Sequence, residues 1–235
     1  MKYKSPAITL TYIKYGESSI VSKMFTKEKG LQTFLVKGVR SKKSKKKISY
    51  FEPLKLLTVD AKYTNTKSMH YIEEIDILHV TENSFDKINR NFIAYFIAEI
   101  FSKVLQDNEQ NYDLFDYLWI LSIKLFNSEK INPNFAILFL LDLSKFLGFY
   151  PSLENLEKSF FDIKNSYTLI KRKKNEEDDF YKKLNYLKEI IRSQKVNMPQ
   201  KIRSEILKDF LKYYKLNYYN LDNVTSHLII EELRW

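Results

Sequence analysis

The spacing of apolar residues changes its period near residue 80, and this change limits the possible folds more than any other feature. Before that point, apolar residues alternate with polar ones in short segments, as in strands with one buried face. After it, they recur every three or four residues, as in amphipathic helices. We therefore predict an α+β protein with two domains, residues 1–80 and residues 81–235, and a boundary near Val80–Ser84.

The first 80 residues predict five short strands separated by turns. Gly16, Gly30 and Gly38 mark turns between strand-like segments. Five strands in so short a segment are typical of a small barrel; we favour an OB-type barrel, while an SH3-like barrel fits the same pattern. The predicted strands are Ala7–Tyr15, Ile20–Thr26, Leu31–Val36, Leu54–Tyr63 and Tyr71–Leu78. The expected inward side chains include Ile8, Leu10, Leu54 and Leu56.

The rest of the chain predicts an all-helical domain. The apolar run Phe135–Leu141 predicts a helix buried in a bundle, with Asn132-Pro133 at its start and Gly148 at its end. Between the helices, residues 159–179 are less regular and end in a charged tract that we expect to be exposed. Two earlier helical stripes contain Phe85, Ile88, Phe92, Phe96 and Ile100, with Ser84 as N-cap, and Tyr112, Phe115, Trp119, Ser122 and Phe126. Later helices are predicted over Phe180–Ile191, Ile202–Tyr214 and Val224–Leu233.

The positive charge is concentrated in the predicted barrel. Residues 1–80 contain 16 Lys and Arg against 7 Asp and Glu, whereas residues 81–235 contain 23 against 22. A compositional bias of the genome would spread the lysines along the whole chain. The uneven distribution therefore indicates a polyanionic partner for the barrel.

The most basic segment is Lys37–Lys47, between the third and fourth predicted strands. It has seven basic residues in eleven and no acid, and its glycine and serines disfavour a helix. We expect a loop that contacts phosphates and gains affinity by counterion release. Lysine in place of arginine favours phosphate contact over base reading. The residues of this loop predicted to bind nucleic acid are Lys37, Arg40, Lys42, Lys43, Lys45, Lys46 and Lys47.

Aromatic residues are interleaved with the basic residues, and most of them are expected in the barrel core. Tyr15 and Tyr50 flank a turn and the basic loop, so they are the candidates for stacking on bases. The others are Tyr12, Phe25, Phe34, Phe51, Tyr63 and Tyr71.

The sequence offers little for catalysis, metals or membranes. The three histidines are scattered, no phosphate-binding glycine loop occurs, and the acidic group Glu73, Glu74 and Asp76 has no second cluster to complete a metal site. There is no cysteine, which fits a reducing cytoplasm. The apolar runs are too short to span a bilayer. We expect a cytoplasmic protein that is not an enzyme, without cofactor, metal or membrane partner.

Two segments resemble the RecO family of DNA repair proteins. The first is Ile13–Lys47, with a Tyr-Gly-Glu turn, a Thr-Lys-Glu-Lys-Gly turn and a Lys-Gly-Val-Arg segment that leads into the basic loop. The second is Phe146–Pro151, FLGFYP, which resembles the end of that family's central helix.

The resemblance implies an OB fold followed by a helical domain. It also implies a nucleoid-associated recombination mediator that binds single- and double-stranded DNA, anneals strands and helps load the recombinase. The implied partners are RecR and the acidic C-terminal tail of single-stranded DNA-binding protein (SSB), with Lys145 as a candidate contact for the tail. Many members carry a four-cysteine zinc site that this chain lacks, and we expect apolar packing by Phe160, Phe161 and Tyr167 in its place.

Two alternatives remain from the residues alone. An RNA-binding barrel protein would use the same lysine loop, because phosphate contacts do not distinguish the sugars. A protein-interaction scaffold could use the loop to bind an acidic partner.

Overall fold

The computed structural model describes residues 2–41, 44, 46–62, 69–78, 86–154, 174–193 and 196–233, with the backbone alone described for 174–178. The chain divides into two compact units, residues 1–130 and 131–235, which we describe separately. The expected boundary at Val80–Ser84 lies outside the described residues. A domain boundary near residue 80 therefore stays a prediction.

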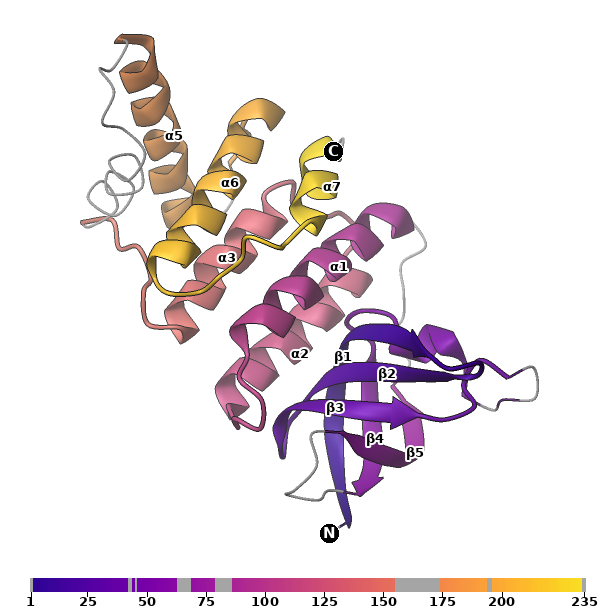
Figure 1. Ribbon diagram of the computed structural model, residues 1–235. Coiled ribbons are helices and arrows are strands. Elements are labelled where there is room, and N and C mark those ends of the chain that lie inside the picture. Colours follow the sequence, from indigo (N-terminus) through magenta and orange to yellow (C-terminus); the bar gives the residue numbers. More distant parts are fainter. Residues whose placement is uncertain are drawn as a thin grey trace. The chain divides into compact units, whose positions relative to one another are not determined.

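The first unit contains a closed five-stranded barrel, which confirms the predicted α+β class and the OB-type barrel (Figure 1). The first strand starts at Lys2, five residues before the predicted start, and Leu54 adopts a positive φ of 60° in the turn before the fourth strand. The strands follow one another around the barrel in the order β1-β2-β3-β5-β4. Their bounds are β1 Lys2–Tyr15, β2 Ser19–Thr26, β3 Gly30–Val36, β4 Leu56–Lys62 and β5 His70–Ile77.

The strand register shows how steeply the strands are tilted. A row of paired residues that starts at Ile13, near the end of β1, passes across all the strands and returns to β1 at Lys2, near its beginning. A closed barrel requires such a stagger between its strands. This row lies on the outer surface and runs Ile13, Val21, Leu35, Tyr71, Lys62 and Lys2. β3 and β5 pair in parallel with Phe34 opposite His70 and Leu35 opposite Tyr71, so the end of β3 lies beside the beginning of β5.

The predicted inward side chains are buried, but the barrel interior is filled by other residues. Ile8, Leu10, Leu54 and Leu56 are each 2% exposed or less. None of them belongs to the interior cluster. That cluster comprises Ala7, Ile20, Met24, Phe34, Val36, Val39, Phe51, Leu57, Val59, Ala61 and Ile72.

For Ile8 and Leu56, the register shows that the prediction of an inward orientation was wrong. Ile8 pairs with Phe25 on one side and Leu56 on the other, so the three side chains share one face. Phe25 contacts the rings of Phe101 and Phe115, which belong to helices outside the barrel. Both faces of this part of β1 are therefore buried, and a bulge at Thr9–Thr11 interrupts the alternation, so a simple alternating pattern could not identify the inner face.

Two helices, α1 (Lys87–Val104) and α2 (Tyr112–Asn127), complete the first unit. The connection between them contacts the beginning of β3: Gln32 Nε2 donates to Asn108 Oδ1 at 2.9 Å, and the backbone NH of Asn108 donates to Leu31 O at 3.1 Å. On the first helix, the expected N-cap Ser84 and the stripe residue Phe85 lie outside the described residues. The residue before α1 is Asp86, which has φ 61°.

The second unit contains α3 (Phe135–Phe146), α5 (Lys174–Ser193), α6 (Gln200–Leu216) and α7 (Ser226–Glu232). The predicted start of α3 at Asn132-Pro133 is two residues early, because Asn132 Oδ1 accepts from the backbone NH of Asn134, which is the N-cap. The helix ends at Phe146, and Gly148 follows with φ 83°, as expected of the residue that stops it. α5 begins inside the charged tract, ahead of Phe180, and residues 155–173 lie outside the described part.

Aromatic residues hold the second unit together. The Phe149 ring contacts Tyr213 and Tyr214 of α6. The Tyr214 hydroxyl donates to Leu140 O of α3 at 2.7 Å. None of the described helices combines the length and the apolar composition that crossing a membrane requires.

Candidate nucleic-acid interface

The basic loop begins with a segment fixed to the neighbouring β1–β2 turn. Gly38 has φ 71°, and Val39 is buried in the barrel interior. The backbone NH of Arg40 donates to Ser18 O at 2.8 Å, and its guanidinium donates to Gly16 O at 3.0 Å. The first half of the loop therefore has a defined position at one end of the barrel, with Lys37 and Arg40 exposed on it.

The second half of the loop is attached to β5. Lys46 Nζ donates to the backbone oxygen of Glu73 at 3.2 Å, and partial burial lowers the pKa of Lys46. Lys47 is exposed just before the short 3-10 helix η1 (Ile48–Phe51), whose Phe51 is buried in the barrel. Lys42, Lys43 and Lys45 lie outside the described residues, so their predicted role is untested.

The two predicted stacking residues differ in their surroundings. Tyr15 ends β1 and is 53% exposed, so its ring is open to a ligand. Tyr50 is half-buried and packs against the barrel interior, which favours a role in the core over base stacking. The structure adds a third aromatic: Tyr71 at the start of β5 is exposed, and Lys37 Nζ lies 5.1 Å from its ring centroid. The alternation of β5 could have indicated that Tyr71 points outward.

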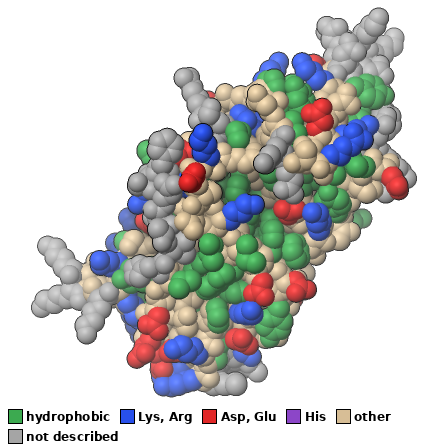
Figure 2. Space-filling view, turned by 180° about the vertical axis from the view of Figure 1, so that it is seen from behind, with side chains coloured by type: hydrophobic (Ala, Val, Ile, Leu, Met, Phe, Trp, Pro, Cys, Tyr) green, Lys and Arg blue, Asp and Glu red, His purple; other side chains and the backbone are tan. Residues whose placement is uncertain are grey.

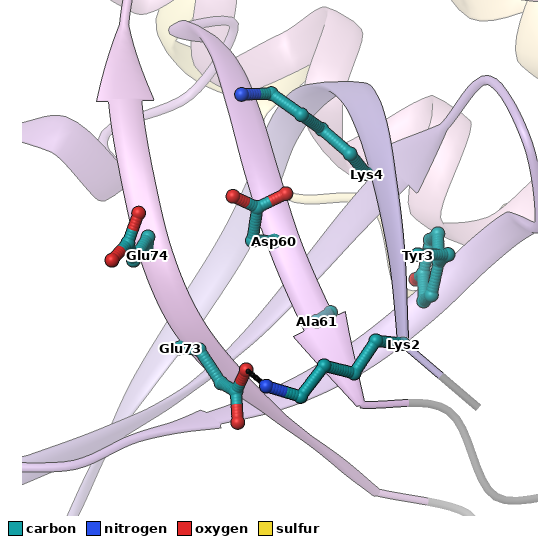
Figure 3. A pocket seen from close by; sticks show the side chains of 7 residues that line it. All are labelled: Lys2, Tyr3, Lys4, Asp60, Ala61, Glu73 and Glu74. Atoms are coloured by element: carbon teal, nitrogen blue, oxygen red, sulfur yellow. Dashed lines mark ion pairs between the residues drawn. The ribbon is translucent and has the colours of Figure 1, made fainter.

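A pocket with two lysines and three acidic residues in its lining lies on the outer surface of β1, β4 and β5 (Figure 3). Glu73 accepts from Lys2 at 2.8 Å and from Lys62 at 2.5 Å. Hydrogen bonds from Lys2 and then Lys62 lower the pKa of Glu73, while the Glu73 hydrogen bond raises that of Lys2. Its carboxylate is thereby neutralised. Among the described residues, no three His, Cys, Asp or Glu side chains form a possible metal site.

In the second unit, Lys145 lies in the last turn of α3. Its ammonium group is 2.8 Å from Asp142 Oδ1 and 4.9 Å from the ring centroid of Tyr150. The hydrogen bond to Asp142 raises the pKa of Lys145. Large hydrophobic side chains also reach the surface, as Figure 2 shows for one face of the molecule. Those exposed in the second unit include Phe146, Leu153, Tyr181, Leu216, Tyr218, Leu228 and Ile229.

Comparisons with known proteins agree with the sequence and the fold. The model of the N-terminal part of recombination protein O matches residues 1–81, and the model of the C-terminal part matches residues 86–224. A DNA repair protein RecO from Flavobacterium psychrophilum is 31% identical, over 100% of this chain and 98% of the relative. The Christiangramia forsetii protein of the same description is 28% identical over 99% of both chains. One from Bacteroides fragilis is 34% identical over 71% of this chain and 69% of its own.

Proposed function

The chain belongs to the RecO family of DNA repair proteins, and on this premise we propose that it is a recombination mediator that binds single- and double-stranded DNA through the barrel. The observation that carries the proposal is the basic loop, residues 37–47, which holds seven basic residues and no acid. Arg40 attaches the first half of this loop to the β1–β2 turn, so the exposed charge of Lys37 lies at that end of the barrel. Lys47, in the second half of the loop, is also exposed.

The chemistry of such a site suits strand annealing. Two complementary strands repel each other through their phosphates, and lysines that neutralise phosphates reduce this repulsion. Since lysine contacts phosphates as a point charge, the loop would hold many sequences equally and leave the base edges free to pair. This requires no catalytic group, and we propose that the protein itself performs no covalent chemistry.

We propose further that the second unit serves the protein partners. Its exposed hydrophobic residues and Lys145 could receive the acidic, aromatic-ended tail of SSB, and RecR would be the second partner in loading the recombinase. Asp142 already pairs with Lys145, so a tail carboxylate would have to replace it. These events would take place in the cytoplasm, at the nucleoid.

A competition experiment separates this function from its alternatives. Full-length protein bound to labelled single-stranded DNA is titrated with unlabelled DNA, with RNA of the same sequence, and with an acidic peptide ending in Asp-Phe. The proposal predicts displacement by DNA at the lowest concentration and no displacement by the peptide. Displacement by RNA at lower concentrations than DNA would favour an RNA-binding protein. Displacement by the peptide alone would favour a scaffold for acidic proteins.

A further inference from the structure

The outer row of the barrel contains an aromatic side chain in a basic setting that the proposed phosphate contacts do not use. Tyr71 is the second residue of β5 and is 42% exposed. It pairs with Leu35 of β3 on one side and Lys62 of β4 on the other. Lys37, two residues beyond Leu35 on the same face, places its ammonium group 5.1 Å from the Tyr71 ring centroid. The ring therefore lies between Lys37, the first residue of the basic loop, and β4.

The neighbouring surface favours a nucleobase over other flat ligands. In the same row, Leu35, Val21 and Ile13 provide an apolar strip that ends at the Ile13 side chain, which is 66% exposed. The nearby acid, Glu73, is already neutralised by Lys2 and Lys62. An apolar strip that adjoins Lys37 and the basic loop matches a single strand, whose bases are flat and apolar on their faces and whose backbone is anionic.

We propose that Tyr71 is a base-stacking platform for single-stranded DNA and that Lys37 covers it in the free protein. On binding, a base takes the place of the ammonium group on the ring and Lys37 moves to the adjacent phosphate. The exchange is favourable because an exposed cation–π contact is weaker than base stacking and the lysine gains a phosphate partner. This inference rests on the proposed DNA binding and adds to it a preference for unpaired bases.

The test compares substitutions in the full-length protein. Affinities for labelled oligothymidine and for a duplex of equal length are measured by fluorescence anisotropy. Tyr71→Leu should weaken oligothymidine binding roughly 5- to 150-fold, the loss expected for one stacked base, and leave the duplex affinity nearly unchanged. Tyr71→Phe should bind like the unmodified protein. Lys37→Gln should weaken both complexes and lower the slope of log affinity against log salt by roughly 0.7 to 0.9.

Tyr112→Leu is the matched control. Tyr112 is 47% exposed at the start of α2. It follows the α1–α2 connection, which contacts the beginning of β3, whereas Tyr71 lies beside the end of β3. This variant should retain both affinities, and urea unfolding should show whether Tyr71→Leu remains as stable as this control.

A second measurement needs no substitution. Oligonucleotides carrying 5-iodouracil are irradiated in complex with the unmodified protein, and the cross-linked peptide is identified by mass spectrometry. The expected cross-link is on Tyr71. Cross-links elsewhere with none on Tyr71, or equal affinities of Tyr71→Leu and the unmodified protein, would overturn the stacking role while leaving the DNA-binding function intact. An unmodified protein that binds neither DNA form would overturn both proposals.

Discussion

Gly30 lies directly against the backbone of Glu109. A Cβ atom built on Gly30 would be 2.0 Å from the Glu109 carbonyl oxygen, and Gly30 also has φ 65°. The contact joins the beginning of β3 to the α1–α2 connection. A 2.8 Å ion pair joins Lys27, in the turn before β3, to Asp116 of α2. The two helices thus belong with the barrel in the unit that ends at residue 130.

Gly30→Ala should destabilise the protein more than Gly16→Ala. Both positions have positive φ, which costs an alanine roughly 1–2 kcal/mol, but a Cβ at Gly16 would meet no atom within 4 Å. The clash with Glu109 should add about 1–3 kcal/mol at Gly30. Urea unfolding of the two variants measures the difference. Equal losses of unfolding free energy in the two variants would show that Gly30 is not in close contact with the Glu109 backbone in solution.

Replacing the buried Arg90 should also be costly. Its guanidinium donates to Leu125 O and, at 2.6 Å, to Ser128 O, so it satisfies backbone oxygens at the end of α2. Arg90→Met leaves these oxygens buried without a charged donor, and we expect a loss of roughly 2–4 kcal/mol. Lys103→Met, on the exposed side of the same helix, should change the unfolding free energy by less than about 0.5 kcal/mol. Similar losses in the two variants would contradict the structural role of Arg90.

The salt dependence of DNA binding should report the basic loop. Each neutralised phosphate contributes about 0.7 to 0.9 to the slope, and about three to five contacts are realistic for this loop. Changing Lys42, Lys43, Lys45, Lys46 and Lys47 together to alanine should flatten the slope by roughly 2–4 units and weaken all sequences alike. If the variant kept both its DNA affinity and its salt slope, the DNA-binding site would have to lie outside the loop.

Lys145→Ala should weaken binding of an acidic peptide ending in Asp-Phe, by roughly tenfold, because a charged hydrogen bond is lost. DNA affinity should not change. The control is Lys215→Ala, since Lys215 pairs with Asp222 at 2.6 Å as Lys145 pairs with Asp142. Calorimetry on the full-length variants gives both affinities. If the control loses as much peptide affinity as Lys145→Ala, the contact is a general charge effect.

Chelators should leave the melting temperature of the protein unchanged. Without cysteine and with three dispersed histidines, the chain offers too few ligands for a structural zinc. Metal analysis of the purified protein is the companion measurement. Stoichiometric zinc whose removal lowers the melting temperature would contradict the prediction.

The sequence by itself determined the elements and the charge. Strands and helices follow from local periodicity, so the five barrel strands and the end of α3 before Gly148 were predicted, although β1 starts five residues earlier than expected. The position of the basic loop between the third and fourth strands was also predicted from the sequence.

Only the tertiary structure decided which surfaces each element buries. Ile8 and Leu56 face α1 and α2 outside the barrel because Phe25 beside them contacts both helices, and no local pattern contains that information. Likewise, Tyr50 packs on the interior while Tyr71 is brought beside Lys37 by the parallel pairing of β3 with β5. Burial and contact depend on residues far apart in the chain, and these meet only when the barrel closes.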